Sequence, residues 1–175
     1  PTSGNVGSDA SVIDMLTRSK QNRFRVFTNA KNIYNSYGSS LSLNYNVFKS
    51  YAISGNINYN KLSQVDASDI FLTSFNTPDW YSNVSVGNRE FIKNVGFNVT
   101  WRWQNTFYWE SSLANGQVPA YSTIDAQFNF KLPKINSTIK VGGTNVLNNR
   151  YIQFAAGPTI GALYYVAWTV DGLLK

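Results

Sequence analysis

The stretch Tyr121–Lys131, Tyr-Ser-Thr-Ile-Asp-Ala-Gln-Phe-Asn-Phe-Lys, decides the fold class. Positions 124, 126, 128 and 130 are apolar, whereas positions 123, 125, 127, 129 and 131 are polar. A period of two is typical of a β-strand with one apolar and one polar face. After a short turn the pattern resumes at Thr138–Thr144, and it returns at Tyr164–Asp171. A last strand this regular predicts a sheet that must close on itself or be completed by another strand.

Alternating segments continue upstream of this stretch, and the connections between them differ in length. The expected strands are Phe24–Phe48, Tyr51–Asn60, Trp80–Val86 and Val95–Gln104, the last able to continue to Trp109. Short turns are expected at Lys49–Ser50, Gly87–Lys93 and Leu132–Asn136, and long loops at Ser63–Thr77, Thr106–Val118 and Asn145–Thr159. Short turns at one end of the strands and long loops at the other are typical of membrane β-barrels.

The number of strands depends on the segment Phe24–Phe48, where the side-chain parity changes near Ile33–Gly38. This change indicates either a bulge in one long strand or a turn at Asn35–Gly38 between two strands. The alternation of short and long connections favours one strand and a total of seven; eight is the alternative. Residues 1–23 then form an outer loop, and residues 24–175 form a single, partial domain of barrel strands. Because the sequence begins at Pro1 without an initiator Met or a signal peptide, we expect a mature or partial chain.

Composition excludes several classes of protein. The 175 residues contain no Cys and no His, which argues against a disulfide scaffold, a thiolate metal site and His-based catalysis. We therefore expect no enzymatic activity and no cofactor. Apolar residues make up 43% of the chain, yet no run reaches the roughly 18–20 residues of a membrane helix. The net charge is +6, but the basic residues form no stripe with interleaved aromatics, so nucleic-acid binding is not expected.

Two architectures fit this pattern, a membrane β-barrel and a soluble β-barrel or sandwich. The polar face carries mostly Ser, Thr, Asn and Gln rather than charges, with Arg102, Asp125 and Lys140 as exceptions. Tyr and Trp gather near strand ends, as in the aromatic girdles of membrane proteins. These features favour the membrane barrel and leave the soluble reading open. The expected lipid-facing residues are Val99, Trp101, Phe128, Val141 and Val166.

The segment Gly142–Tyr151 reads Gly-Gly-Thr-Asn-Val-Leu-Asn-Asn-Arg-Tyr and is followed by Gly157–Tyr165. It is similar to the C-terminal ending of TonB-dependent outer-membrane receptors, whose late barrel strands several other segments also resemble. The resemblance extends from about Ser19 onward through Asn32–Tyr45, Asn76–Trp80 and Gly96–Gln104. The most similar branch carries an additional carboxypeptidase-regulatory-like domain at its N-terminus. The sequence departs from the family at Asp171–Lys175, where many outer-membrane strands finish on an aromatic residue.

This resemblance implies an all-β fold: an antiparallel transmembrane β-barrel segment of about seven to eight strands from a larger, 22-stranded barrel. It implies the outer membrane of a Gram-negative cell and import of a large nutrient, with peptide, glycan, siderophore and cobalamin all open. The implied partners are outer-membrane lipid, an N-terminal plug domain, the remaining barrel strands, a surface lipoprotein and the TonB energy-coupling complex, reached through a region outside this sequence. The alternatives are a small self-contained outer-membrane barrel acting as an adhesin or assembly partner, and a soluble ligand-binding β-barrel.

Five residues are candidates for contact with a ligand in the lumen or at its rim. Arg102 and Asp125 lie on the polar faces of adjacent strands, roughly opposite each other, so we expect them to pair. Their pair either contacts substrate or is an internal ion pair or plug contact, and Lys140 either extends it or reaches into water. Tyr151 and Phe154 near the outer rim either stack on sugars or peptides or belong to the aromatic girdle.

Overall fold

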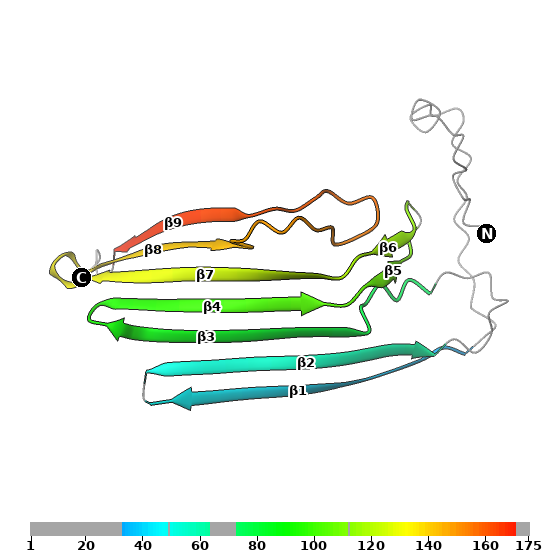
Figure 1. Cartoon of the computed structure of the whole chain (residues 1–175), viewed down its shortest axis with the longest axis horizontal. Coiled ribbons are helices and arrows are strands. Elements are labelled where there is room, and N and C mark those ends of the chain that lie inside the picture. The colour runs from blue at the N-terminus through cyan, green and yellow to red at the C-terminus, as the bar shows by residue number, and fades with distance from the viewer. Residues whose placement is uncertain (1–32, 49, 64–72, 112, 171–175) are drawn as a thin grey trace, which may run out of the picture.

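The computed structural model describes residues 33–48, 50–63, 73–111 and 113–170, which form two antiparallel sheets (Figure 1). The large sheet has seven strands in the order β1-β2-β3-β4-β7-β8-β9. Its strands are β1 (Asn35–Val47), β2 (Tyr51–Ser63), β3 (Trp80–Ile92), β4 (Val95–Gln104), β7 (Tyr121–Leu132), β8 (Ser137–Thr144) and β9 (Leu163–Val170). The small sheet pairs β5 (Phe107–Trp109) with β6 (Gly116–Val118), and a 3-10 turn, Pro133–Ile135, joins β7 to β8. No helix in the described ranges is long and apolar enough to cross a membrane.

The seven-strand prediction for the large sheet is confirmed, and the alternative turn at Asn35–Gly38 is wrong. In the register of β1 with β2, Asn35 lies opposite Ser63 and Gly38 lies opposite Asn60. Residues 35–38 are therefore paired within β1 and form no turn. The expected outer loop 1–23 and the first part of the expected strand, residues 24–32, lie outside the described residues.

Two predicted boundaries are wrong for local reasons. The predicted turn at Gly87–Lys93 is mostly strand, because β3 continues to Ile92 through an irregularity between Asn88 and Ile92. The buried side chain of Asn88 accepts a hydrogen bond from the backbone N–H of Glu90 at 2.8 Å, which stabilises this bulge. The predicted continuation of β4 to Trp109 also fails, because the chain leaves the sheet after Gln104 and forms the β5–β6 hairpin within the expected long loop.

The strand register confirms the predicted separation of the two faces. Residues directly opposite each other in an antiparallel pair point to the same face. One row across the sheet reads Phe97, Phe128, Val141 and Val166, and it includes three of the five residues expected to face lipid. Side chains two positions apart along a strand also point to the same face. A row of opposite parity reads Ser54, Ser85, Thr100 and Asp125.

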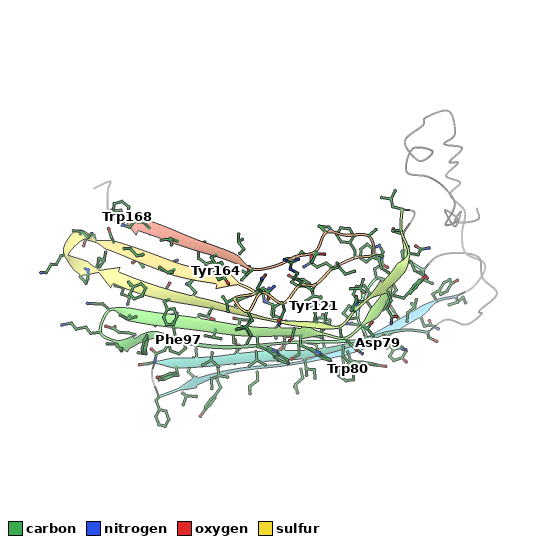
Figure 2. The ribbon with its side chains drawn as sticks, turned by 45° about the horizontal axis from the view of Figure 1, so that its top comes forward. Asp79, Trp80, Phe97, Tyr121, Tyr164 and Trp168 are labelled. Atoms are coloured by element: carbon green, nitrogen blue, oxygen red, sulfur yellow. The ribbon has the colours of Figure 1, made fainter. Side chains whose placement is uncertain are left out.

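The polar face is the concave face of the sheet. Two hollows of about 510 and 600 Å³ are lined mainly by residues of polar-face parity, among them Asn83, Arg102, Asn98 and Gln127. In Figure 2, Trp80 projects below the lower strands and Trp168 projects above β9, as side chains on the convex side of a curved sheet do. The residues expected to face lipid thus belong to the convex face.

The described residues build almost no hydrophobic core. Among the residues that the structure describes, only Val118 and Ala155 are buried hydrophobic residues, and both lie in the connections at one end of the sheet. By contrast, Leu41, Val166 and Trp168 on the apolar face are 72%, 73% and 68% exposed. No second layer of the described chain covers this face, so its apolar side chains require another environment.

Both edges of the large sheet are open in the described chain, since β1 pairs only with β2 and β9 only with β8. An odd number of antiparallel strands makes β1 and β9 run in the same direction. They begin at the end with the long connections, which we call the loop end, and finish at the end with the short turns, which we call the turn end. Antiparallel pairing of β1 with β9 is therefore geometrically excluded.

The Gly142-Gly143 pair in β8 provides space for two tyrosine rings of β9. Gly142 lies opposite Tyr165 and Gly143 lies opposite Tyr164. The Tyr165 ring therefore covers Gly142 on one face of the sheet, and the Tyr164 ring covers Gly143 on the other. A Cβ atom at Gly142 would lie 2.9 Å from the Tyr165 hydroxyl and 2.8 Å from the carbonyl oxygen of Ala126. The open space at Gly142 lets the Tyr165 hydroxyl reach across β8 and donate a hydrogen bond to Gln127 Oε1 at 2.7 Å.

We expect Gly142→Ala to lower the free energy of unfolding by about 1–3 kcal/mol, because the added methyl group must displace both the tyrosine and the backbone of β7. Gly55→Ala in β2 is the matched control, since its Cβ would meet its nearest neighbours at 3.5 and 3.7 Å, which is ordinary contact. Urea unfolding of the two variants in lipid vesicles measures the difference. Equal losses in both would show that the Tyr165 ring is not held over Gly142.

Candidate functional site

A concave site lies at the loop end, where β3, β4 and β7 meet the long connections. It encloses about 510 Å³ and is called the loop-end pocket. Its walls combine strand residues with residues of the connections 76–78 and 145–153. The lining residues are Asn76, Thr77, Pro78, Tyr81, Asn83, Arg102, Trp103, Gln104, Tyr121, Thr123, Asp125, Thr144, Asn145, Tyr151 and Gln153.

Arg102 and Asp125 form an ion pair in this pocket, as predicted. Arg102 Nη2 lies 2.7 Å from Asp125 Oδ2. The two residues are diagonal neighbours, because Arg102 lies directly opposite Thr123 and Asp125 directly opposite Thr100. The Asp125 side chain is 17% exposed and the Arg102 side chain 57% exposed. Much of the guanidinium group is therefore free to contact a further group in the pocket.

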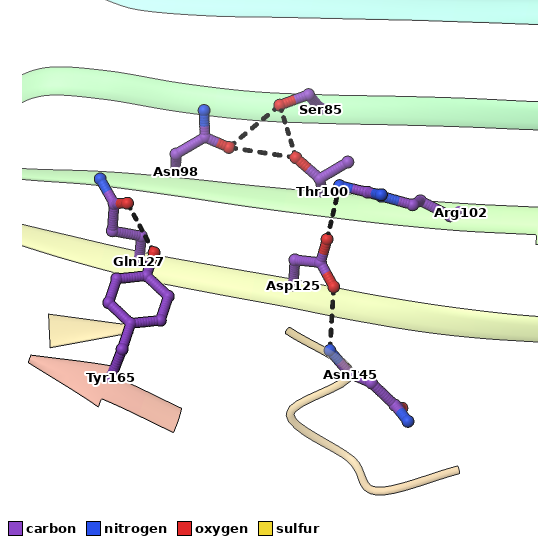
Figure 3. A network of polar contacts seen from close by, with 8 residues as sticks. All are labelled: Ser85, Asn98, Thr100, Arg102, Asp125, Gln127, Asn145 and Tyr165. Carbon is purple, nitrogen blue, oxygen red and sulfur yellow. Dashed lines mark hydrogen bonds and ion pairs between the residues drawn. The ribbon is translucent and has the colours of Figure 1, made fainter. Parts of the chain in front are cut away.

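Asp125 also holds the chain after β8. Its second carboxylate oxygen, Oδ1, accepts the backbone N–H of Asn145 at 2.9 Å (Figure 3). The carboxylate thus joins β4, through Arg102, to the start of the long connection 145–162. The pair predicted from the sequence is part of a structural network as well as part of the pocket wall.

The polar wall beside this ion pair is uncharged and internally hydrogen-bonded (Figure 3). Ser85 Oγ donates to Asn98 Oδ1 at 3.0 Å, and Thr100 Oγ1 donates to Ser85 Oγ at 3.0 Å. Hydroxyl and amide groups that satisfy one another in this way fix the wall without introducing charge. Arg102 and Asp125 are therefore the charged side chains that line the loop-end pocket.

The Asn-Val-Leu-Asn-Asn segment, 145–149, makes the tight turn that leads out of β8. Asn145 is 2% exposed, and its side chain donates to the Asn149 carbonyl at 2.7 Å and accepts from the Asn149 N–H at 3.1 Å. Asn145 and Asn148 have φ angles of 50° and 54°, a left-handed conformation that Asn tolerates better than most residues. Asn148 Oδ1 accepts the Ala162 N–H at 3.0 Å, which draws both ends of the connection together.

A second group of hydrogen bonds stabilises the opposite rim of the pocket. The Glu110 carboxylate accepts hydrogen bonds from Thr73 Oγ1 at 2.9 Å and from the Ser74 N–H at 3.0 Å. The Asn76 side chain donates to the Glu110 carbonyl at 2.9 Å and accepts the Glu110 N–H at 2.7 Å. The segment before β3 is thereby tied to the β5–β6 hairpin, so the rim is shaped before any ligand arrives.

The two aromatic candidates have different positions. The Tyr151 ring stacks on Tyr121, with ring centres 4.1 Å apart and planes at 28°, and both rings line the pocket. Phe154 packs instead on Trp109 of β5, with ring centres 5.6 Å apart, and is not part of the pocket lining. Phe154 therefore joins two connections to each other, whereas Tyr151 presents a surface to the pocket.

Lys140 lies away from the pocket. It is exposed on the polar face opposite Asn129 and Ala167, nearer to the turn end than Asp125. The structure thus brings Arg102, Asp125 and Tyr151 together and leaves Lys140 and Phe154 elsewhere. Ligand contact by any of the five residues stays a prediction.

Several residues of the pocket, notably Tyr121, Gln153 and Asn76, were not among the candidates predicted from the sequence. Tyr121 has the same strand parity as Asp125, so the alternation that identified the polar face also contained the signal for Tyr121. Gln153 and Asn76 belong to irregular connections, where side-chain direction follows no period. Only the folded connections place them at the rim.

Solved structures that are similar to this chain in fold include two receptors. The siderophore receptor PiuA from Acinetobacter baumannii has a TM-score of 0.56 and 14% sequence identity, over 78% of this chain and 22% of that chain. A variant of the ferric enterobactin receptor PfeA from Pseudomonas aeruginosa has a TM-score of 0.53 and 16% identity, over 75% of this chain and 21% of that chain. The seven-stranded sheet therefore has the fold of a segment of a larger antiparallel β-barrel.

The sequence resemblance noted in Gly142–Tyr151 is supported at the level of fold by these two receptors. The barrel segment spans about a fifth of the length of the chains it matches, 22% and 21%. No protein-family profile and no curated protein matches its sequence.

Proposed function

We propose that this barrel segment is the C-terminal part of a TonB-dependent receptor in the outer membrane of a Gram-negative cell, and that the whole receptor imports a large nutrient. The observation that carries the proposal is the uncovered apolar face of the seven-stranded sheet, opposite a concave face of Ser, Thr, Asn and Gln. Membrane barrels have this distribution, with apolar side chains toward lipid and polar side chains toward a lumen. Transport rather than catalysis is part of the proposal.

The open edges support a larger barrel completed by other strands of the same protein. In hydrocarbon, each unpaired backbone N–H or C=O group costs several kcal/mol, so β1 and β9 both require partners. The proposed whole is a plugged barrel of about 22 strands, of which this chain supplies about seven. A plug domain, a TonB complex and a surface lipoprotein are further parts of this proposal, and none of the described residues is assigned to their contacts.

The loop-end pocket is the proposed place of ligand contact. It combines one accessible guanidinium group, a stacked aromatic pair and several amide side chains around about 510 Å³. A volume of this size accommodates a drug-sized ligand or one part of a larger one. Ferric siderophores lead the list of nutrients to test, because the two structural neighbours are named as receptors for such compounds.

Deletion and complementation of the gene test the proposal. The full-length product should fractionate with the outer membrane, and its folded and boiled forms should migrate differently on a gel. Loss of the gene should remove growth on one member of a panel of ferric siderophores, cobalamin, peptides and glycans. That growth should also depend on the proton gradient that energises TonB. A soluble product, or unimpaired growth on every member of the panel, would contradict the proposal.

Tyr151→Ala should raise the ligand concentration for half-maximal uptake by about 2- to 10-fold, because one stacked aromatic contact contributes about 0.5–1.5 kcal/mol. Phe154→Ala is the matched control, since Phe154 lies on the same connection but packs on Trp109 outside the pocket. Uptake of radiolabelled nutrient in complemented cells, normalised to receptor abundance, is the measurement. Equal changes in both variants would place ligand contact elsewhere.

A further inference from the structure

Aromatic side chains of the convex face gather near the turn end. The row through Val99, in the middle of the sheet, is aliphatic. Nearer the turns, the convex aromatic residues are Tyr51, Phe91, Phe97, Phe128, Phe130 and Trp168. Phe91 packs edge-on against Phe97 with ring centres 5.3 Å apart, and Phe97 and Trp168 lie toward this end of the sheet in Figure 2. In a membrane barrel such a belt marks the boundary between hydrocarbon and headgroups.

Two lysines lie in neighbouring turns just beyond this aromatic belt. Lys93 begins the two-residue turn between β3 and β4, and Lys134 is the middle residue of the 3-10 turn between β7 and β8. The backbone N–H of Lys131, near the end of β7, donates to the Asn94 carbonyl at 2.8 Å and so joins the two turns. With neighbouring strands about 4.8 Å apart, the turns lie roughly 10 Å from each other. The side chains of Lys93 and Lys134 are exposed, and neither forms an ion pair within the described residues.

Each of these two lysines adjoins a large apolar side chain that the described chain leaves uncovered. Ile92, which precedes Lys93, is 59% exposed, and Ile135, which follows Lys134, is 57% exposed. An alkyl group beside an ammonium group suits the surface of a membrane, because the first meets acyl chains while the second meets phosphates. The described acidic side chain of these turns, Glu90, accepts a backbone N–H of the first turn at 3.0 Å. The two turns therefore present two amines without carboxylate partners and two apolar groups.

We propose that these two turns bind the phosphate groups of an anionic phospholipid, phosphatidylglycerol, in the leaflet next to the short turns. The proposal rests on the proposed function, because the turns meet lipid headgroups only where the sheet spans the membrane. Short turns of such barrels face the periplasm, so the leaflet beside them is the phospholipid leaflet. A zwitterionic headgroup brings its own ammonium group to its phosphate, whereas the phosphate of phosphatidylglycerol is free to pair with Lys93 or Lys134. One lysine beside an anionic lipid should give about a fivefold preference.

Light-activated lipid probes test this contact in the full-length gene product, reconstituted in phosphatidylcholine vesicles. Two probes share the same acyl chains and carry a diazirine close to the glycerol; one has the phosphatidylglycerol headgroup and the other the phosphatidylethanolamine headgroup. After illumination, peptide mass spectrometry locates the labelled residues. We expect the phosphatidylglycerol probe to label the peptides that contain Ile92 and Ile135 about five times more than the other probe does. This preference should fall toward one in about 1 M salt, where the screening length is about 3 Å.

Lys93→Gln combined with Lys134→Gln is the decisive variant, because it removes both amines and keeps polar side chains in the turns. The two probes should label this variant equally, whereas Lys140→Gln, which removes an exposed cation from the concave face, should keep the fivefold preference. Equal labelling of the wild type by both probes, a preference that survives in the double variant, or no labelling of the turns would overturn the proposal. A third probe, with its diazirine at the end of an acyl chain, should label the peptide that contains Val99. Absence of that label would instead contradict the proposed function.

Discussion

Val99→Lys should lower the free energy of unfolding in lipid vesicles by about 2–4 kcal/mol, the cost of a lysine that faces lipid near the bilayer midplane. Val99 lies opposite Val86 on one side and Ala126 on the other, on the apolar face and near the middle of β4. An ammonium group there must either enter hydrocarbon or bend its side chain toward the interface. Both options are unfavourable, and the described chain has no acidic side chain on that face nearby.

Thr100→Lys is the matched control for this experiment, one residue further along the same strand. Thr100 lies opposite Asp125 on the polar face, so a lysine there points into water beside a carboxylate. The loss of the Thr100 hydrogen bond to Ser85 is small, and we expect less than about 1 kcal/mol. Urea unfolding of the full-length protein in phosphatidylcholine vesicles, followed by tryptophan fluorescence, measures both. Similar losses for the two variants would reject the assignment of the faces.

The sequence predicted the faces and most strands well, because side-chain alternation has a period that needs no tertiary information. Tyr121–Lys131 was expected as a strand, and β7 spans Tyr121–Leu132. The predicted strand boundary was wrong where polar residues lie inside a strand. Gly87–Lys93 has the composition of a turn, yet the strand continues through it as a bulge that the Asn88 side chain stabilises. The β5–β6 hairpin was also missed, since three residues are too few to display a period.

The candidate site was predictable only in part, for a similar reason. Arg102 and Asp125 stood out among the few charges on a mostly uncharged face, and neighbouring strands brought them together. Lys140 lies on the same polar face, but side-chain alternation does not say how far along the sheet it lies from Arg102 and Asp125. That separation follows only from the register of β7 with β8. Tyr121, Gln153 and Asn76 complete the pocket through the folding of the connections, which depends on hydrogen bonds such as those of Asn145 and Glu110.

Asp125→Ala should lower the free energy of unfolding by about 2–4 kcal/mol, an effect similar in size to that of Val99→Lys. Asp125 is only 17% exposed and accepts from two partners, Arg102 Nη2 at 2.7 Å and the Asn145 N–H at 2.9 Å. Hydrogen bonds to a charged group contribute about 1.5–3 kcal/mol, and a donor left without a partner adds a desolvation cost. The buried Asn145 turn also loses its connection to β7 through this carboxylate.

Two further variants divide this effect between its partners. Arg102→Ala should cost no more than about 1 kcal/mol, because the arginine side of the pair is largely exposed and the Asp125 carboxylate keeps its hydrogen bond from the Asn145 N–H. Asp125→Asn should fall between the two, since its amide oxygen can still accept the Asn145 N–H while the charge is lost. Urea unfolding gives the order, and limited proteolysis of the connection 145–162 reports whether the Asn145 turn opens. If Arg102→Ala proved as costly as Asp125→Ala, the ion pair itself would dominate, and anchoring of the connection through Asn145 would be secondary.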